Sequence, residues 1–424
     1  MNQTYLIIYS VLLLIVFIFY QKRKKTFDAG SLLLLVFFVG SIFSELIYYK
    51  SFNDGSFAFP LIYLFAALMI SFAPIMKFRD SIPIVFPRRS LINLLSWIFV
   101  VSTIWGMLTS SNNVIDGLRN VLLDESAGLE MYNGMLDSVE NQGHTIHNLP
   151  MIIMNMMYSF AALLLFVNLT FEKPNKLLVV LIAFSLFYGA IKYISIGERG
   201  GLVNRSLVVL ISYVCLKSHL SDSINKKIRR IGIIVAVALF VPFMALTISR
   251  FGDTYGGSTN SLYNYAGQGT IHFCQYGLDD NGIRYGDRTM SLFKRFLGFP
   301  NTPHNFLERR SKYPHLKIND EVFSTYVGDF TIDYGPILAM IIFILYSILM
   351  TNMVQRHSNR IMFHSFVLLH FSMCVFVQGV SLFQYADTGN LTILLYILLY
   401  FYFKYANVYT EKRKVAYADN SMSI

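Results

Sequence analysis

Hydrophobic residues run along the chain in long blocks that are separated by polar stretches. Apolar runs of about 20 residues, long enough to cross a hydrocarbon core of roughly 30 Å, recur throughout. They predict eleven transmembrane helices, at residues 4–20, 29–49, 57–76, 91–110, 151–171, 177–196, 201–217, 231–249, 336–354, 361–381 and 390–408. The expected fold class is therefore an all-α polytopic integral membrane protein, with residues 1–424 forming a single membrane domain.

Two longer polar stretches interrupt this pattern, at residues 111–150 and 250–335. The first is acidic, with Arg119 as its single arginine. The second contains many tyrosines and phenylalanines, whereas disordered segments are poor in aromatic residues. Because long loops in folded proteins are usually functional, we expect residues 250–335 to form a large, partly helical cap over a site in the membrane.

Two helices are predicted within this cap. Apolar residues from Phe323 to Phe330 recur at the spacing i, i+3, i+4, i+7, which predicts a helix over Asp320–Gly335. Two aspartates share its other face. Asp287–Phe299 places apolar residues beside two basic ones, which predicts a short helix at the membrane interface.

Lysines and arginines cluster in alternate loops. They follow the first, third, fifth, seventh, ninth and last predicted spans, at residues 22–25, 77–89, 173–176, 226–230, 356–360 and 412–414. Because basic residues in short loops mark the cytoplasmic side, the N-terminus is predicted to lie outside and the C-terminus inside. Both long polar stretches then lie on the external side, with 250–335 as the large extracytoplasmic loop.

The composition is typical of a membrane protein and indicates which class of partner to expect. The chain is 54% hydrophobic and 14% charged, whereas soluble domains carry roughly 25% charged residues. The net charge of +10 arises in the basic loops, so we expect the lipid bilayer, and not a nucleic acid, as a partner. The three cysteines are expected to be free thiols. Residues 6–20 are expected to form the first span and not a cleavable signal peptide.

Nucleotide and metal chemistry have no clear signature in the sequence. The chain contains neither a P-loop nor a Gly-x-Gly-x-x-Gly fingerprint after a strand. His144 and His147 form a pair without an evident third ligand, which favours surface histidines over a metal site. No cofactor and no metal ion are therefore expected.

Basic residues gather around one predicted external turn, Ile196–Gly201. Arg199 lies in the turn, with Lys192 before it, Arg205 after it and Arg250 at the start of the cap. Ionisable residues at the membrane boundary are costly, and arginine suits bidentate phosphate binding. The four residues are predicted to hold a diphosphate. In the alternative, Arg199 pairs with the neighbouring glutamate and the others extend to lipid headgroups.

Candidate general bases lie in the cap. The candidates for removing a proton from an acceptor hydroxyl are Asp329, Asp333, Glu308, Glu321 and His304. Arg288 and Asp333 complete the predicted substrate-binding residues. Helix capping and loop salt bridges are the alternative explanation for each of the carboxylates.

At these residues the chain resembles bacterial O-antigen and capsular oligosaccharide repeat-unit polymerases of the Wzy type. The resemblance rests on the external turn Glu198–Gly200, on Arg250 at the end of a span, on one dominant external loop, and on the run Phe323–Gly335 before the next span. The Arg-x10-Gly spacing that some members carry in their external loops does not occur in the long loop of this chain.

The resemblance implies a metal-independent glycosyltransferase of the bacterial cytoplasmic (inner) membrane, with its active site facing the periplasm or exterior. Such enzymes join oligosaccharide units carried on undecaprenyl diphosphate into O-antigen of lipopolysaccharide or into capsular polysaccharide. The growing chain leaves its lipid for a hydroxyl of the next lipid-linked unit. Family arginines correspond here to Arg199 and Arg250 and, more loosely, to Arg205. A chain-length regulator and a flippase are expected partners.

Three other functions stay open. An O-antigen ligase shares the topology and the basic external loops, but it transfers finished glycan to a lipid core or a protein. A lipid-linked oligosaccharide flippase or other transporter is also polytopic and basic, but is expected to have more even spans, charges inside the bundle and no such cap. The third is a non-enzymatic scaffold subunit.

Overall fold

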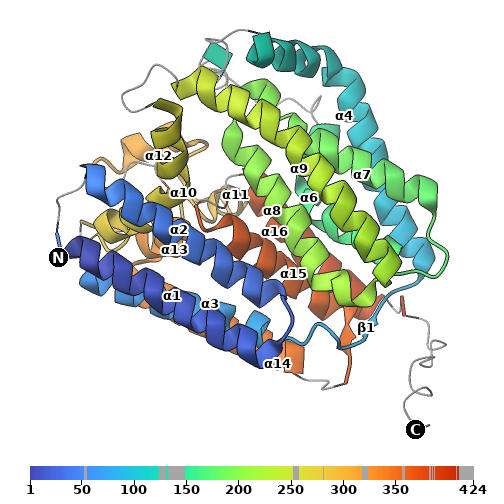
Figure 1. The fold of residues 1–424 in the computed structure, drawn as a ribbon, viewed down its shortest axis with the longest axis horizontal. Helices are drawn as coiled ribbons and strands as arrows, with labels where there is room; N and C mark the ends of the chain where they lie inside the picture. The colour runs from blue at the N-terminus through green and yellow to red at the C-terminus, as the bar shows by residue number, and fades with distance from the viewer. Residues whose placement is uncertain are drawn as a thin grey trace.

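The structure, a computed structural model of the chain, is dominated by helices (Figure 1). It describes residues 1–51, 55–123, 130–131, 149–251, 257–279, 281–317, 323–355, 359–381, 383, 385, 387–406 and 408–409. The elements up to residue 219 are α1 (Asn2–Lys24), α2 (Ala29–Ser51), α3 (Ala58–Lys77), β1 (Ile84–Val85), α4 (Arg89–Leu123), α6 (Leu149–Leu169), α7 (Lys176–Ile191), the 3₁₀ turn η2 (Ile194–Ile196), α8 (Arg199–Leu216) and the 3₁₀ turn η3 (Lys217–His219). The remaining elements are α9 (Asp222–Phe251), α10 (Gly257–Tyr276), α11 (Ser291–Phe296), α12 (Phe306–Lys312), α13 (Thr325–Tyr334), α14 (Pro336–Gln355), β2 (Ile361–Met362), α15 (Phe363–Gln378) and α16 (Asp387–Tyr405).

The helices confirm an all-α membrane protein. Each of the eleven predicted spans overlaps a helix. Among the residues that the structure describes, nine helices are long and apolar enough to cross a membrane. The tenth and eleventh predicted spans correspond to α15, which has 16 residues, and to α16, which is not among the nine. A total of eleven crossings therefore stays a prediction.

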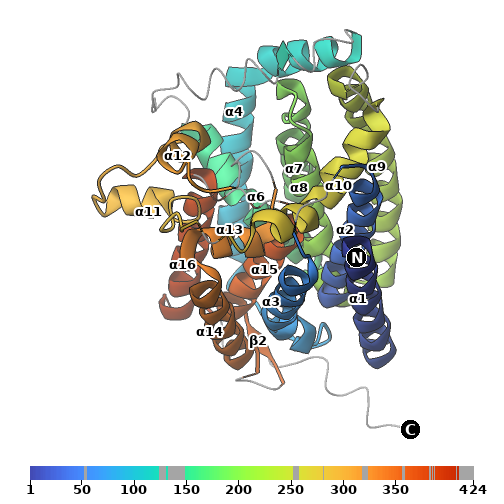
Figure 2. The ribbon, with the colours of Figure 1, turned by 90° about the vertical axis from the view of Figure 1, so that its left-hand side faces the viewer.

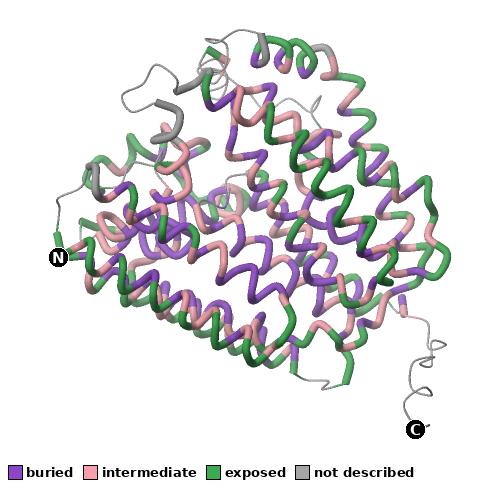
Figure 3. The backbone as a smooth tube through the Cα atoms, viewed as in Figure 1, coloured by how far each residue is buried: buried purple, intermediate pink, exposed green. Residues whose placement is uncertain are grey.

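Burial distinguishes central helices from those at the surface (Figure 3). On α9 the apolar side chains of Ile234, Val237 and Val241 are exposed. On α6, by contrast, Leu163 and Leu164 are completely buried. Because exposed isoleucine and valine are stable against hydrocarbon but costly in water, this face of α9 is suited to contact lipid.

Loops predicted to be cytoplasmic meet at one end of the bundle. The Lys24 Nζ donates a hydrogen bond to the Phe78 carbonyl, which joins the loops after α1 and α3. The Lys217 Nζ donates to the Phe27 carbonyl, which adds the end of α8. These contacts confirm that the three basic loops lie side by side, as their charges predicted.

Strands β1 and β2 close the same end of the bundle. They pair in parallel, with Ile84 opposite Ile361, although they are far apart in the sequence. The Arg88 N–H donates to the Val408 carbonyl at 2.9 Å, which brings in the segment after α16. We call this region the basic end, and it comprises residues 22–28, 77–89, 217–229, 359–362 and 408–409.

The first part of the predicted acidic loop is helical, which corrects its expected boundary. Helix α4 continues through residues 111–123 instead of ending near residue 110. Val114, Gly117, Leu118 and Val121 fall at the spacing i, i+3, i+4, i+7, and the side chains of Val114 and Val121 are buried. The apolar stripe therefore extends the helix beyond the predicted span. Most of residues 124–148 lie outside the described residues.

The predicted cap contains four helices in its described part, α10 to α13 (Figures 1 and 2). Helix α10 packs directly on α2, because Gly267 leaves room for the backbone of Phe43 and Ser44. The Ser44 hydroxyl donates to the Gly267 carbonyl at 2.6 Å. The first helix of the stretch is therefore joined to the helical bundle itself.

Helix α13 matches the predicted helix in the cap, with a shorter extent. It begins at Thr325 and ends at Tyr334, and Pro336 starts α14 as expected from the suitability of proline for a first turn. Both faces of α13 are buried, because other parts of the chain cover the aspartate face as well as the apolar face. The predicted interfacial helix is also shorter, since α11 spans only Ser291–Phe296.

A histidine inside the bundle is hydrogen-bonded by hydroxyl groups of two other helices. His370 on α15 is fully buried, and its ring nitrogens lie 2.7 Å from the Ser212 hydroxyl and 3.2 Å from the Tyr396 hydroxyl. Burial of a polar group costs free energy unless it is hydrogen-bonded, so these contacts explain how a histidine is tolerated here. All three cysteines are free, as predicted.

Candidate functional site

The basic turn lies where α8 begins. Gly197 adopts a left-handed conformation with φ 73°, and Arg199 is the first residue of α8. Helix α8 has 18 residues, which span about 27 Å at 1.5 Å per residue, and it ends at Lys217 in the basic end. The turn is therefore at the opposite end of the bundle from the basic end, as predicted.

Two adjacent glycines allow tyrosine rings to lie against the start of α8. A Cβ atom on Gly200 would lie 2.1 Å from the Tyr265 hydroxyl oxygen, and a Cβ atom on Gly201 would lie 2.0 Å from Cδ1 of Tyr193. No side chain larger than hydrogen fits at either position without displacing a ring. The glycine pair thus fixes one tyrosine from α10 and one from the turn itself.

Arg199 is held by the first of these tyrosines. Its guanidinium carbon lies 5.3 Å from the Tyr265 ring centroid, within the range of a cation–π contact. Its Nη1 donates to the Thr247 hydroxyl on α9 at 3.4 Å. Only 5% of the Arg199 surface is exposed, so the charge sits in the protein and not among lipid headgroups. The alternative in which Arg199 pairs with Glu198 is not tested by these contacts.

Arg205 is held by two further tyrosines. Its guanidinium carbon lies 3.9 Å from the Tyr158 ring centroid and 5.5 Å from that of Tyr193. Its Nη2 donates to the Asn155 amide oxygen at 3.1 Å and to the Tyr193 hydroxyl at 3.2 Å. No carboxylate contacts Arg205 among the residues that the structure describes. Its positive charge is oriented without being neutralised there.

Lys192 belongs to the same group of cations. The Lys192 Nζ lies 3.8 Å from the Met151 sulfur, and its charge is close enough to that of Arg205 for the two to repel. Two like charges held near each other are stabilised when an anion binds between them. Lys192, Arg199 and Arg205 together are called the arginine turn below.

A small separate core supports the arginine turn. Its buried members come from α4, α7, η2, α8 and α9, and they are Val121, Ala190, Ile194, Leu202 and Leu246. A Cβ atom on Gly117 of α4 would lie 2.3 Å from the Ser195 carbonyl oxygen, so α4 packs closely on η2. The part of α4 beyond its predicted end therefore packs on η2 and helps to hold the arginine turn in place.

The predicted cap residues form a different group, which is a buried ion-pair network. Arg284 Nε lies 3.0 Å from Asp333 Oδ1, and Arg288 Nε lies 2.8 Å from Asp329 Oδ1. The other Asp333 oxygen accepts hydrogen bonds from Thr289 N–H at 2.8 Å and from its hydroxyl at 2.7 Å. All four charged side chains are at most 6% exposed. Loop salt bridges, the alternative explanation for these carboxylates, are what the structure contains.

Asp287 extends this network to α11 and α12. Its carboxylate contacts Lys294, the Lys312 Nζ at 2.6 Å and the Tyr313 hydroxyl at 2.7 Å. Burial raises the pKa of the Asp287 carboxyl, but the hydrogen bonds from these three groups outweigh burial and hold the pKa below its ordinary value. The ionised form is therefore favoured, and it ties the outer helices of the cap to the buried network.

His304 lies in a small polar pocket of the cap. The pocket has a volume of about 510 Å³ and is lined by residues 295, 298, 299, 301–304, 308 and 312. The backbone N–H of His304 donates to Glu308 at 2.7 Å, and Asn305 caps α12 by accepting from the Glu308 N–H at 2.9 Å. The His304 side chain is exposed. Of the five predicted base candidates, His304 and Glu308 line this cavity, and Asp329 and Asp333 are buried in ion pairs. Glu321 lies outside the described residues.

Three predictions concern residues that are not fully described. The backbone of Arg250 lies in the last turn of α9, and its side chain is outside the described part of the structure. His144 and His147 are also outside it. Within the described residues, no group of three or more histidines, cysteines or acidic residues is arranged to hold a metal ion.

The sequence did not indicate the tyrosines that hold the arginine turn. Tyr158, Tyr193 and Tyr265 are separated from the arginines by a few to more than sixty residues, and nothing in their spacing shows the contacts. The pair Gly200-Gly201 was the available signal, because adjacent glycines inside a helix often mark close approach by another group. Comparison of the chain with protein-family models, with curated proteins and with solved structures finds no match.

Proposed function

We propose that the chain is a membrane glycosyltransferase of the Wzy type, which polymerises undecaprenyl-diphosphate-linked oligosaccharide units on the predicted external side. The observation that carries the proposal is the arginine turn. Arg199 and Arg205 are oriented by tyrosine rings and by neutral oxygens, at the end of the bundle opposite the basic end. Arginines fixed in this way are suited to bind the oxygens of a diphosphate.

The proposed reaction needs a good leaving group. The acceptor hydroxyl oxygen forms a bond with the anomeric carbon of the growing chain, and the bond from that carbon to the diphosphate oxygen breaks. The diphosphate keeps the electron pair and stays on its lipid. Charges of the arginine turn stabilise the negative charge that develops on that oxygen.

The acceptor must lose its hydroxyl proton in the same step. We assign proton removal to the His304 imidazole, because it is exposed in a polar pocket, whereas Asp329 is committed to Arg288. Phe299 and Asn301 line the same pocket and are suited to pack on and hydrogen-bond a sugar. The cap would then bring the acceptor to the donor, which converts a bimolecular step into an oriented one.

The test is a glycan ladder from a deletion strain complemented with matched amounts of wild-type protein, Arg199→Ala, Arg205→Ala or Arg205→Lys. Loss of a group that stabilises charge in the transition state typically lowers a rate by about 100-fold or more. We expect both alanine variants to reduce the ladder to single repeat units. Arg205→Lys keeps the charge but loses the planar donor geometry, so we expect partial activity.

Arg119→Ala is the control, because it removes an exposed arginine from the same predicted side, and its ladder should match the wild type. Intact ladders in both alanine variants would reject the arginine turn as the diphosphate site. Long glycans that accumulate on the lipid carrier in the deletion strain would instead identify a ligase. A deletion strain with normal polymer would reject both functions.

A further inference from the structure

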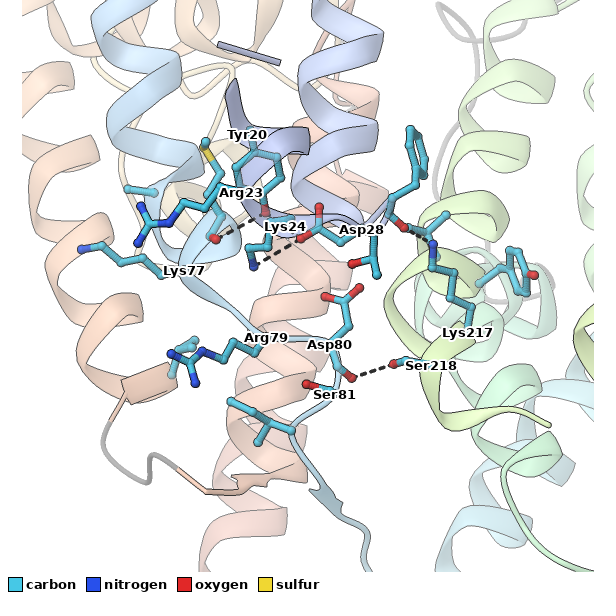
Figure 4. Close-up of a pocket in the computed structure, with 18 of the residues that line it drawn as sticks. Tyr20, Arg23, Lys24, Asp28, Lys77, Arg79, Asp80, Ser81, Lys217 and Ser218 are labelled. Carbon is cyan, nitrogen blue, oxygen red and sulfur yellow. Dashed lines mark hydrogen bonds and ion pairs between the residues drawn. The ribbon is translucent and has the colours of Figure 1, made fainter. Parts of the chain in front are cut away.

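A large cavity opens at the basic end, far from the arginine turn. Its volume is about 1600 Å³, and it lies between the ends of α1, α3, α8 and α14 and the loops that follow them (Figure 4). Hydrogen bonds between these loops form one wall. The Ser218 hydroxyl donates to the Asp80 carbonyl at 2.6 Å, and the His219 ring lies 3.1 Å from the Ile82 carbonyl. The cavity is thus a built feature and not a gap between loosely placed loops.

Positive charge is in excess around this cavity. Six lining residues are cationic, namely Arg23, Lys24, Lys77, Arg79, Lys217 and Arg229. Two are acidic, Asp28 and Asp80, so the six cations exceed the two carboxylates by four. Figure 4 shows Arg23, Lys77 and Arg79 on one side of the cavity and the two aspartates on the other.

Asp28 is already engaged within the protein, whereas Asp80 has a buried carboxyl oxygen, Oδ2, without a hydrogen-bond partner among the described residues. Asp28 lies 3.3 Å from the Lys24 Nζ and accepts from the Tyr20 hydroxyl at 2.6 Å. Burial, followed by the charge of Asp28, raises the pKa of the Asp80 carboxyl to about 7, against the opposing effect of Lys24 and Lys217. The ionised form of Asp80 is therefore disfavoured by its surroundings, and the excess of four cations is counted with both aspartates ionised.

The cations on the rim have no acidic partner in the part of the chain that the structure describes. Arg23, Lys77, Arg79 and Arg229 take part in none of its ion pairs. Four cations that converge on one cavity repel one another, and an anion placed among them removes that cost. Phosphate groups are suited to such a site, since arginine binds them through two parallel hydrogen bonds.

The deeper wall of the cavity is apolar. Met69 and Ala73 of α3, Leu210 and Val214 of α8 and Val354 of α14 line it. These helices are among the nine that can cross a membrane, so the apolar wall continues into the hydrocarbon region. A ligand that fills the whole cavity needs a negatively charged head and an apolar tail. Basic cavities between transmembrane helices bind anionic lipid headgroups in this way.

We propose that this cavity binds a phosphate-bearing anionic lipid, with the phosphate on Arg23, Lys77 and Arg79 and the acyl chain along α3, α8 and α14. The site is separate from the arginine turn, and its occupancy does not depend on the proposed glycosyl transfer. A lipid bound here would tie together the ends of four helices.

The experiment is native mass spectrometry of the purified full chain after delipidation, with phosphatidylglycerol or phosphatidylcholine added in equal amounts. The cavity variant is R23Q/K77Q/R79Q. The control is K22Q/K227Q/R230Q, which removes three exposed basic residues from the same end that do not line the cavity. We expect one phosphatidylglycerol to be retained by the wild type and the control, and about tenfold weaker retention by the cavity variant.

Equal retention by all three proteins would overturn the proposal, because it would mean non-specific attraction to a basic surface. A preference for phosphatidylcholine would overturn it as well. Inorganic pyrophosphate is added in a separate arm. If pyrophosphate binds to the wild type and not to the cavity variant, while phosphatidylglycerol binds to neither, the ligand is a soluble phosphate and the lipid assignment fails.

Discussion

The arginine turn and the cap network both bury arginines, but they treat the charge in opposite ways. Arg284 and Arg288 contact carboxylates at 3.0 and 2.8 Å. Arg205 contacts two tyrosine rings, a tyrosine hydroxyl and an amide oxygen, and no carboxylate among the described residues. A carboxylate neutralises the guanidinium that it orients, whereas an aromatic face and a neutral oxygen orient the guanidinium and leave most of its charge in place.

This difference separates arginines that hold the fold from arginines that can bind a ligand. Replacing a partner in a buried ion pair leaves the other charge in a medium that solvates it poorly, so stability falls. Arg205 contacts rings and neutral oxygens among the described residues, so its replacement leaves no uncompensated charge on those partners. Mutations in the cap network should therefore affect unfolding first, and mutations in the arginine turn should affect activity first.

The largest effect is expected from breaking an ion pair of the cap. Asp333→Ala removes the carboxylate that contacts Arg284 and Thr289, and removal of one member of a buried pair costs about 3–5 kcal/mol. We expect a loss of this size in the unfolding free energy of the purified protein in detergent. The measurement is a denaturant titration of wild type and variant under identical conditions.

The matched control for this pair removes both charges at once. Apolar residues of similar volume often replace a buried ion pair with little loss, so Arg284→Met combined with Asp333→Leu should recover at least half of the lost stability. The double variant could instead lose as much unfolding free energy as Arg284→Met and Asp333→Leu lose separately, added together. The two side chains would then not act as a unit. The contrast between the two groups of arginines would then lose its basis.

A smaller effect on activity is expected from the glycines of the arginine turn. Gly201→Ala would place a methyl group 2.0 Å from the Tyr193 ring, which must then move away from Arg205. Misplacement of a binding group by about 1 Å can lower a rate by roughly 100-fold, and a tenfold reduction of the glycan ladder is the minimum that we expect.

Gly232→Ala is the control for this variant, since Gly232 is also helical but has no atom within 4 Å of an added Cβ. Alanine favours a helix over glycine by about 1 kcal/mol at either position, so helix propensity predicts the same direction for both variants. A normal ladder in Gly232→Ala and a reduced one in Gly201→Ala would isolate the contact with Tyr193. Normal ladders in both would show that the position of this ring does not matter.

The membrane spans and the basic loops could be predicted from the sequence. Spans were predictable because a membrane imposes long apolar runs, and the basic end was predictable because lysine and arginine concentrate in alternate loops. The position of Arg199 at the end of a span followed from the same rules. The continuation of α4 to Leu123 was missed, although the spacing of Val114, Leu118 and Val121 pointed to it.

Tertiary contacts were not accessible in the same way. The cap sequence has nearly balanced charges, but nothing in it shows that Asp329 pairs with Arg288 while Asp333 pairs with Arg284. Likewise, Tyr265 reaches Arg199 only because α10 packs back into the bundle. Local spacing predicts which residues share one helix face, and packing between distant segments decides which of them meet.

The smallest effect is expected from pH, and it concerns Asp287 of the cap network. The pKa of Asp287 is lower in the folded protein than in an unfolded chain, where an aspartate has a pKa of about 3.9. Its contribution to stability is therefore complete above about pH 4 and is lost as pH falls through the folded value.

Melting temperatures between pH 6 and pH 3 would measure this contribution, with Asp287→Asn compared with Asp116→Asn, an exposed aspartate on α4. The wild type and Asp116→Asn should lose stability together at the acid end of the range. Asp287→Asn should begin with lower stability and change less, because it cannot lose the contacts of a charge that it does not have. Parallel curves for all three proteins would mean that Asp287 does not secure α11 and α12.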